Sequence, residues 1–157
     1  VAEPLVRVDT HDGGTIPTLE ATAGAVDAAA IARLPIMLEP FMSDRVGGRV
    51  MNDLSAEAVI QSTSIASSLG NSSASTWMKL PVVENMEAVM EATTLPTLLL
   101  GGDNGGDPQQ TFATWERALG LPGVRGLTVG RTLLYPEDGD VASAVDTAAR
   151  LVHRDLD

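Results

Sequence analysis

The sequence contains no cysteine and only one lysine, and aromatic side chains make up 3% of its 157 residues. Without cysteine the chain can form neither a disulfide framework nor a thiolate zinc site. Because aromatic residues are so few, the core must be built from alanine, valine, leucine, isoleucine and methionine. No apolar run reaches the length of a membrane span and no signal peptide precedes the first apolar stretch, so we expect a cytoplasmic soluble protein.

Basic side chains are also scarce. The sequence has ten lysine and arginine residues and 21 aspartate and glutamate residues, which gives a formal net charge of −11. Nucleic acids and anionic membranes are bound through basic patches, so we expect neither as a partner. A small anionic substrate stays compatible with this composition, because a single arginine can bind a phosphate or carboxylate group.

Five short apolar runs alternate with helical patterns along the chain. The runs cover residues 4–9, 35–41, 76–82, 96–100 and 124–130, and the helical stretches cover about 17–34, 56–69, 84–92, 108–119 and a last segment from 141 onward. Continuous apolar runs are typical of parallel strands that are covered on both faces. Repeats of about 30 residues match βαβ units, which build either an open doubly wound sheet or an arc of a barrel.

Polar and glycine residues fall where these strands end, at Arg7, Asp9, Glu39, Lys79, Gly101 to Asp103, Gly130 and Arg131. In a (β/α)₈ barrel that rim is the active-site face. Neither GxGxxG nor GxxxxGK[ST] follows any strand, which argues against the usual nucleotide-binding folds. A complete barrel takes about 250 residues. We therefore predict an α/β fold, a partial TIM (β/α)₈ barrel that forms a single domain over 1–157, with three N-terminal strands missing or supplied by another chain.

The single lysine, Lys79, lies inside the apolar run 76–82. Alternation along a strand places it on one face with Trp77 and Pro81. An ammonium group directed into a barrel interior is costly to desolvate, so we expect a lowered pKa and a free amine that forms a Schiff base with a carbonyl compound. The simpler alternative is a lysine at a strand end that extends into solvent.

Glu39 lies one strand before Lys79. Its carboxylate would transfer protons during Schiff-base chemistry, and it could equally hold Lys79 or an arginine in an ion pair. Arg7 and Asp9 share a face of the first strand, so they could pair with each other or bind substrate.

Glycines close the last two strands, at Gly101, Gly102 and Gly130. Such glycines let backbone N–H groups approach an anion, and Arg131 adds a charged fork of donors. The loops after the last two strands form the frequent phosphate site of this barrel class. An ordinary tight turn is the alternative interpretation of a glycine pair.

A metal site is a second possibility. His11 and Asp12, together with Glu39 and Asp103, offer nitrogen and oxygen ligands. No HxH or HxxxH spacing supports such a site, and a polar glycine-rich loop is the simpler interpretation. We therefore predict neither a metal nor a cofactor.

These residues resemble the C-terminal part of class I (Schiff-base) aldolases with a (β/α)₈ barrel, from the fourth strand to the eighth helix. The group includes archaeal-type fructose-bisphosphate, deoxyribose-phosphate and tagatose-bisphosphate aldolases. "LPIMLEPFMSD" resembles the fifth strand, "TWMKLPVV" the sixth, "PTLLLGGD" the seventh and "VRGLTVGRTLLYP" the eighth. The Lys-Thr-Ser-Thr-Gly sequence of typical deoxyribose-phosphate aldolases is absent.

The resemblance implies that Lys79 is the Schiff-base lysine, that Glu39 is a catalytic glutamate, and that the strand-end glycines with Arg131 bind substrate phosphate. It predicts a lyase of carbohydrate metabolism that cleaves or forms a C–C bond in a phosphorylated sugar or keto compound. The unpaired edges of a five-unit arc predict a homo-oligomer. The alternatives are a metal-assisted barrel enzyme that uses Glu39, Asp103 and His11, or a non-catalytic fragment that acts by assembly or ligand binding.

Overall fold

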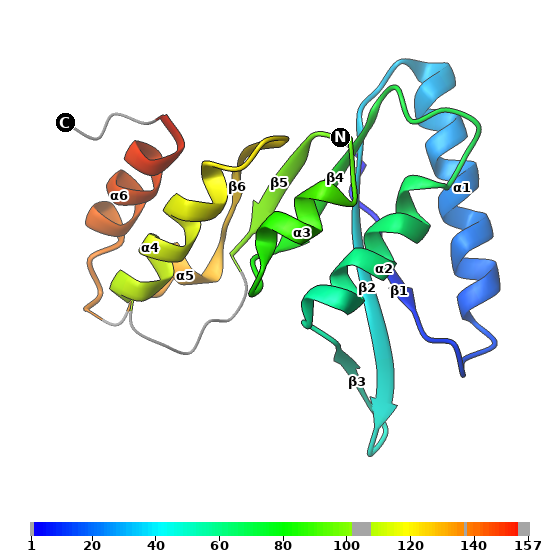
Figure 1. The fold of residues 1–157 in the computed structure, drawn as a ribbon, viewed down its shortest axis with the longest axis horizontal. Coiled ribbons are helices and arrows are strands. Elements are labelled where there is room, and N and C mark those ends of the chain that lie inside the picture. The colour runs from blue at the N-terminus through cyan, green and yellow to red at the C-terminus, as the bar shows by residue number, and fades with distance from the viewer. Residues whose placement is uncertain (1, 102–107, 137, 154–157) are drawn as a thin grey trace.

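Five parallel strands form the body of the molecule (Figure 1). The computed structural model describes residues 2–101, 108–136 and 138–153. The strands are β1 (Leu5–Val8), β2 (Ile36–Val46), β4 (Thr76–Pro81), β5 (Thr97–Leu100) and β6 (Val124–Thr128), and they lie in the order β1-β2-β4-β5-β6. Each neighbouring pair is parallel, so the predicted parallel direction is confirmed, and the sequential strand order is that of a barrel arc.

Helices connect these strands. They are α1 (Thr15–Ala32), α2 (Ala56–Ser67), α3 (Met86–Glu91), α4 (Pro108–Leu119), α5 (Arg131–Leu134) and α6 (Val141–His153). Ser55 caps α2, because its side chain accepts a hydrogen bond from the backbone N–H of Ala58 at 3.3 Å. Asp140 caps α6 in the same way through the N–H of Ser143. Serine and aspartate are both among the residues favoured at this position. Among the described residues, no helix combines the length and the hydropathy that a membrane span needs.

The sheet buries one face beneath the helices. Leu38, Met78, Leu80 and Leu99 are fully buried and belong to one apolar cluster with Val59 of α2, Val89 of α3 and Trp115 of α4. Alternate residues on the same strands, including Glu39, Lys79 and Leu98, are only partly buried. One covered face and one partly open face are expected of a barrel arc whose concave side is not closed.

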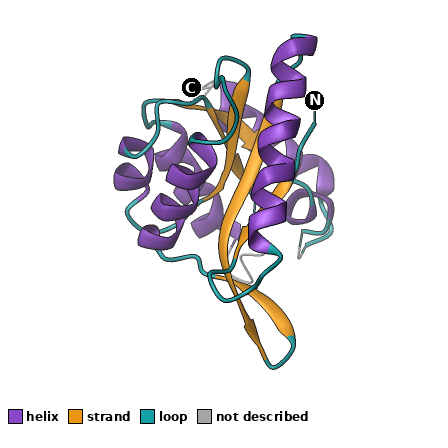
Figure 2. Ribbon diagram, turned by 90° about the vertical axis from the view of Figure 1, so that its right-hand side faces the viewer, coloured by secondary structure: helices purple, strands orange, loops and turns teal. Residues whose placement is uncertain are grey.

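Two elements differ from the sequence prediction. The second strand does not end at residue 41 but continues to Val46, turns at Gly47 and Gly48, and returns as β3 (Arg49–Asn52), antiparallel to β2. The hairpin extends away from the helices (Figure 2). Both glycines have positive φ, 58° and 80°, as a two-residue hairpin turn requires. The apolar run that predicts the strand stops at residue 41, because the end of β2 and most of β3 are exposed and are not marked by apolar content.

The second difference is α5. The segment that was expected to end a strand near residue 130 instead turns into a short helix, with Gly130 at its N-cap and Arg131 as its first residue. The strand itself ends at Thr128. Arg131 is therefore presented by a helical turn above the sheet rather than by the strand.

Candidate active site

The strand register arranges the side chains on the partly open face of the sheet in layers, each with one residue from neighbouring strands at the same level. Leu5 of β1 pairs with Glu39 of β2. On the other side of β2, Leu38 pairs with Met78 of β4, so the next step along both strands brings Glu39 beside Lys79. Because side chains alternate along a strand, the inward-facing residues of one layer come from every second position. Glu39 and Lys79 thus meet in one layer, as the sequence pattern predicts.

The Lys79 ammonium lies between two carboxylates. Its Nζ donates to Oε2 of Glu39 at 3.2 Å and also to Oε1 of Glu3. The Lys79 side chain is 14% exposed, against 19% for Glu39 and 37% for Glu3. The lysine therefore does not extend into bulk solvent, and the alternative of a solvated strand-end lysine is not what the structure shows.

The pKa of Lys79 is shifted in the opposite direction to the one expected from the sequence. Burial acts to lower the Lys79 pKa, but the hydrogen bonds and charges of Glu3 and Glu39 outweigh it, and the pKa is raised above its ordinary value. Desolvation alone would give the expected lower pKa, whereas the second carboxylate, Glu3, acts in the opposite direction. The expected free amine was wrong for this state of the protein, since a lysine with a raised pKa is an ammonium at neutral pH.

A pocket of about 290 Å³ opens beside this pair. Its walls include Leu5, Arg7, Glu39, Phe41, Pro81 and Arg131. Arg7, Glu39 and Arg131 come from three separate elements, and they are three of the residues singled out by the sequence. The pocket therefore combines two arginine side chains with the carboxylate that contacts Lys79.

Arg7 and Asp9 do not pair with each other among the described residues. Arg7 Nε donates to Oδ1 of Asn52 at 3.4 Å, whereas Asp9 Oδ1 accepts from the backbone N–H of His11 at 2.9 Å. Asp9 instead lines a second pocket, of about 270 Å³, whose walls also include Arg7. Arg7 thus lies between the two pockets, and Asp9 is not a lining residue of the one next to Glu39.

The strand-end glycines play different structural parts. Gly101 is buried, and a Cβ there would collide with the side chain of Val129, so this position needs a glycine for close packing of the last strands. A Cβ on Gly130 would meet nothing within 4 Å. The predicted phosphate-binding Gly102 lies outside the described residues.

The candidate metal ligands are only partly brought together. Glu39 faces Lys79, and Asp103 lies outside the described residues. His11 lies beside Asp9 and Asp44, and the possible ligand atoms of these three are within 4.8 Å of one another. Asp12 is paired with Arg45 at 3.2 Å. The N–H of Gly14 and the Arg45 guanidinium lower the Asp12 pKa.

The sequence prediction missed Glu3. The residue precedes the first strand, but it has the same parity as Leu5 and Arg7, and a parallel bridge between Ala2 and Ile36 continues the pairing below the strand. The alternation of positions 3, 5 and 7 was the available signal. Glu3 lies outside the predicted strand because the apolar run begins only at residue 4.

Comparison with known proteins gives the family. The Cgl0159-like family model matches residues 1–149. The crystal structure of Cgl0159 from Corynebacterium glutamicum (Brevibacterium flavum) is 72% identical, with a TM-score of 0.94, and the match covers 99% of this chain and 52% of that chain. The chain belongs to the Cgl0159-like family, and it spans about half the length of this solved relative.

The fold also matches solved aldolases. An archaeal fructose-1,6-bisphosphate aldolase, with its catalytic Lys covalently bound to a carbinolamine intermediate, is 23% identical with a TM-score of 0.73, covering 96% of this chain and 57% of that chain. A Schiff-base-forming fructose-1,6-bisphosphate aldolase is 22% identical with a TM-score of 0.74, over the same shares of the two chains. The predicted α/β fold, a partial TIM barrel, is therefore confirmed. A search of curated protein sequences found no match.

Proposed function

We propose that the protein is a class I aldolase, an aldehyde-lyase that cleaves or forms a C–C bond in a phosphorylated sugar or related keto compound through a Schiff base on Lys79. The observation that carries the proposal is the contact between the Lys79 ammonium and Glu39, at a pocket that also holds Arg7 and Arg131. The aldolase fold of the structural neighbours supports it.

The chemistry is balanced without a cofactor. An ammonium and a carbonyl compound give an iminium and one water, so two ammonium protons leave on the carbonyl oxygen and the nitrogen is cationic before and after. The iminium withdraws electrons from the neighbouring C–C bond. As that bond breaks, the substrate hydroxyl gives its proton to Glu39 and becomes an aldehyde, and an enamine remains on Lys79. Protonation of the enamine carbon and hydrolysis then release the second product.

The two arginines suit an anionic substrate. Arg7 and Arg131 line the same pocket as Glu39, and a guanidinium binds a phosphate group with two parallel hydrogen bonds. In this role they would fix the substrate so that its carbonyl carbon faces Lys79. Asp9 would act on substrate only from the neighbouring pocket, through its position beside Arg7. We also propose that the chain forms one domain within a barrel completed by further strands.

Borohydride trapping tests this function. The full-length protein is incubated with a panel of sugar phosphates and keto acids, reduced, digested and analysed by mass spectrometry. We expect a substrate-dependent mass increase on the peptide that contains Lys79. The Lys79→Arg variant, which keeps the charge but cannot form a Schiff base, is the matched control. Absence of a label at Lys79 across the panel would overturn the proposal.

A further inference from the structure

The second carboxylate at Lys79, Glu3, has no part in the chemistry described above. We propose that Glu3 is a further catalytic residue, which holds the resting Lys79 ammonium away from the pocket and accepts its proton when a carbonyl compound arrives. The inference rests on the proposed Schiff-base function. It divides the work between two carboxylates that contact one nitrogen, with Glu3 serving the lysine and Glu39 serving the substrate.

The layers of the sheet distinguish the two carboxylates. Glu39 is level with Leu5 and Lys79, whereas Glu3 precedes Leu5 by two residues and therefore lies one layer nearer the amino ends of the strands. The pocket lies on the opposite side, toward the carboxyl ends. Its lining includes Glu39 and Pro81 but neither Glu3 nor Lys79. In this structure the amine is thus held by Glu3 outside the lining of the pocket, and Glu39 is its contact on the pocket side.

The charge on the Lys79 nitrogen in each state explains why a second carboxylate is useful. The nitrogen is positive as an ammonium and again as an iminium, so two nearby carboxylates stabilise both states. The neutral amine between them is the state that they disfavour, yet only that state attacks a carbonyl carbon. The proton must therefore leave to a group that is already bonded to the nitrogen. Glu3 makes that bond from outside the pocket, which leaves the Glu39 carboxylate available to the substrate.

The protons of the Lys79 ammonium can be followed through iminium formation, and none is gained or lost. One N–H bond of the ammonium breaks and an O–H bond forms on Glu3. The free amine turns toward the pocket and forms the N–C bond, while the carbonyl oxygen takes the second proton from the nitrogen. For dehydration, Glu3 returns its proton to Nζ, and a proton passes from Nζ through Glu39, at 3.2 Å, to the departing hydroxyl group. Water leaves, the iminium remains, and both carboxylates are again ionised.

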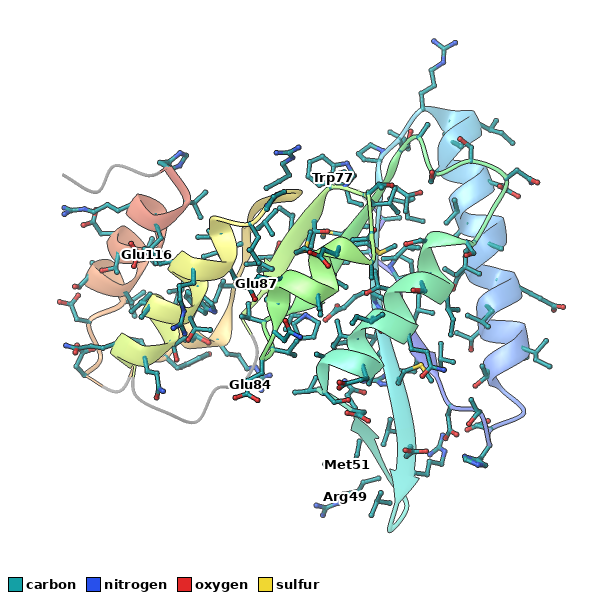
Figure 3. All side chains as sticks on the ribbon, in the orientation of Figure 1. Arg49, Met51, Trp77, Glu84, Glu87 and Glu116 are labelled. Carbon is teal, nitrogen blue, oxygen red and sulfur yellow. The ribbon has the colours of Figure 1, made fainter. Side chains whose placement is uncertain are left out.

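The test compares Glu3→Gln with Glu116→Gln in the full-length protein. Glu116 is exposed on α4, well away from the β1 end of the sheet, and undergoes the same chemical change (Figure 3). The Lys79 pKa is followed by the pH titration of its ¹³Cε signal, which is assigned by its loss in Lys79→Arg. Steady-state rates and borohydride trapping at Lys79 are measured on the same samples.

We expect Glu3→Gln to lower the Lys79 titration midpoint and to decrease kcat on the order of 100-fold while KM stays within about twofold, because a proton acceptor rather than a binding group is lost. Glu116→Gln should change none of these. If the wild type is labelled at Lys79 but Glu3→Gln keeps the wild-type midpoint and kcat, the role of Glu3 is refuted and the aldolase function stands. If the wild type is never labelled, the aldolase function fails and the role of Glu3 fails with it.

Discussion

The guanidinium Nε of Arg7 lies 3.4 Å from the side-chain oxygen of Asn52, so the first strand is tied to the hairpin at the wall of the candidate pocket. Asn52 Oδ1 also accepts a hydrogen bond from the Ser43 hydroxyl at 2.9 Å. One amide oxygen therefore links β1, β2 and the end of β3. The β2–β3 hairpin is thereby part of the candidate site as well as an extension of the sheet.

Replacing Arg7 should weaken substrate binding more than turnover. Arg7→Gln removes a charged donor from the pocket, and a hydrogen bond to a charged group is worth about 1.5–3 kcal/mol, so we expect KM to rise about tenfold or more. Steady-state kinetics with a phosphorylated substrate and its unphosphorylated analogue measure the effect. Arg49→Gln, at the exposed hairpin (Figure 3), should leave KM unchanged. An equal loss for both substrates would contradict a phosphate-binding role.

Removal of metal ions should leave the activity unchanged. The proposed chemistry is carried by Lys79 and two carboxylates, whereas the group of His11, Asp9 and Asp44 lies in the glycine-rich loop and the hairpin. We expect dialysis against EDTA, and separately the His11→Ala substitution, to preserve kcat/KM. Activity that is lost with EDTA and restored by one divalent ion would instead support the metal-assisted alternative.

The ion pairs of Lys79 should stabilise the fold below strongly alkaline pH. Because the folded pKa of Lys79 is raised above the ordinary value of 10.5, the folded state retains its proton where the unfolded state loses it. The contribution is complete below the unfolded pKa and disappears as the pH rises through the folded pKa. Urea denaturation from neutral to alkaline pH should show this loss in the wild type, and Lys79→Met should show a smaller one. If the free energy of unfolding fell equally with pH in both proteins, a stabilising role of the Lys79 ion pairs would be contradicted.

The close approach at Gly101 makes another prediction. Gly101→Ala would place a methyl group against the Val129 side chain, so we expect a destabilisation of about 1–3 kcal/mol, as for overpacked cores. The double variant Gly101→Ala with Val129→Ala should recover part of that loss. Gly24→Ala is the matched control, since Gly24 lies within α1 with open space at its Cβ. It should be neutral or stabilising by up to about 1 kcal/mol. Chemical denaturation measures all four proteins.

Much of the fold could be predicted because the signals were local. Each parallel strand is a short apolar run, and capping residues such as Ser55 mark where a helix begins. Glu39 and Lys79 could be placed together because strand ends of a parallel sheet meet at one edge. Their mutual contact is the part of the candidate site that the structure reproduces most directly.

The rest depended on relationships across the chain. The contact of Glu3 with Lys79 joins residues 76 positions apart. Alternation places Glu3 on the same face as Leu5 and Arg7, but it does not tell which side chain of another strand Glu3 reaches. The raised Lys79 pKa follows from this contact together with the contact to Glu39, so it could not be inferred from burial alone. The Arg7–Asn52 contact likewise requires the hairpin, whose second strand is only four residues long.

The segment from Glu3 to Val8 carries two incompatible sets of side chains. Glu3 and Arg7 face the open side, while Val6 and Val8 are buried under the helices. A one-residue insertion or deletion between positions 4 and 6 would turn one part of this segment over relative to the other, which would drive a charge into the apolar layer or a valine out of it. The length of this short segment is therefore as tightly constrained as its composition, and homologous chains that keep the Lys79 site should show no gaps here.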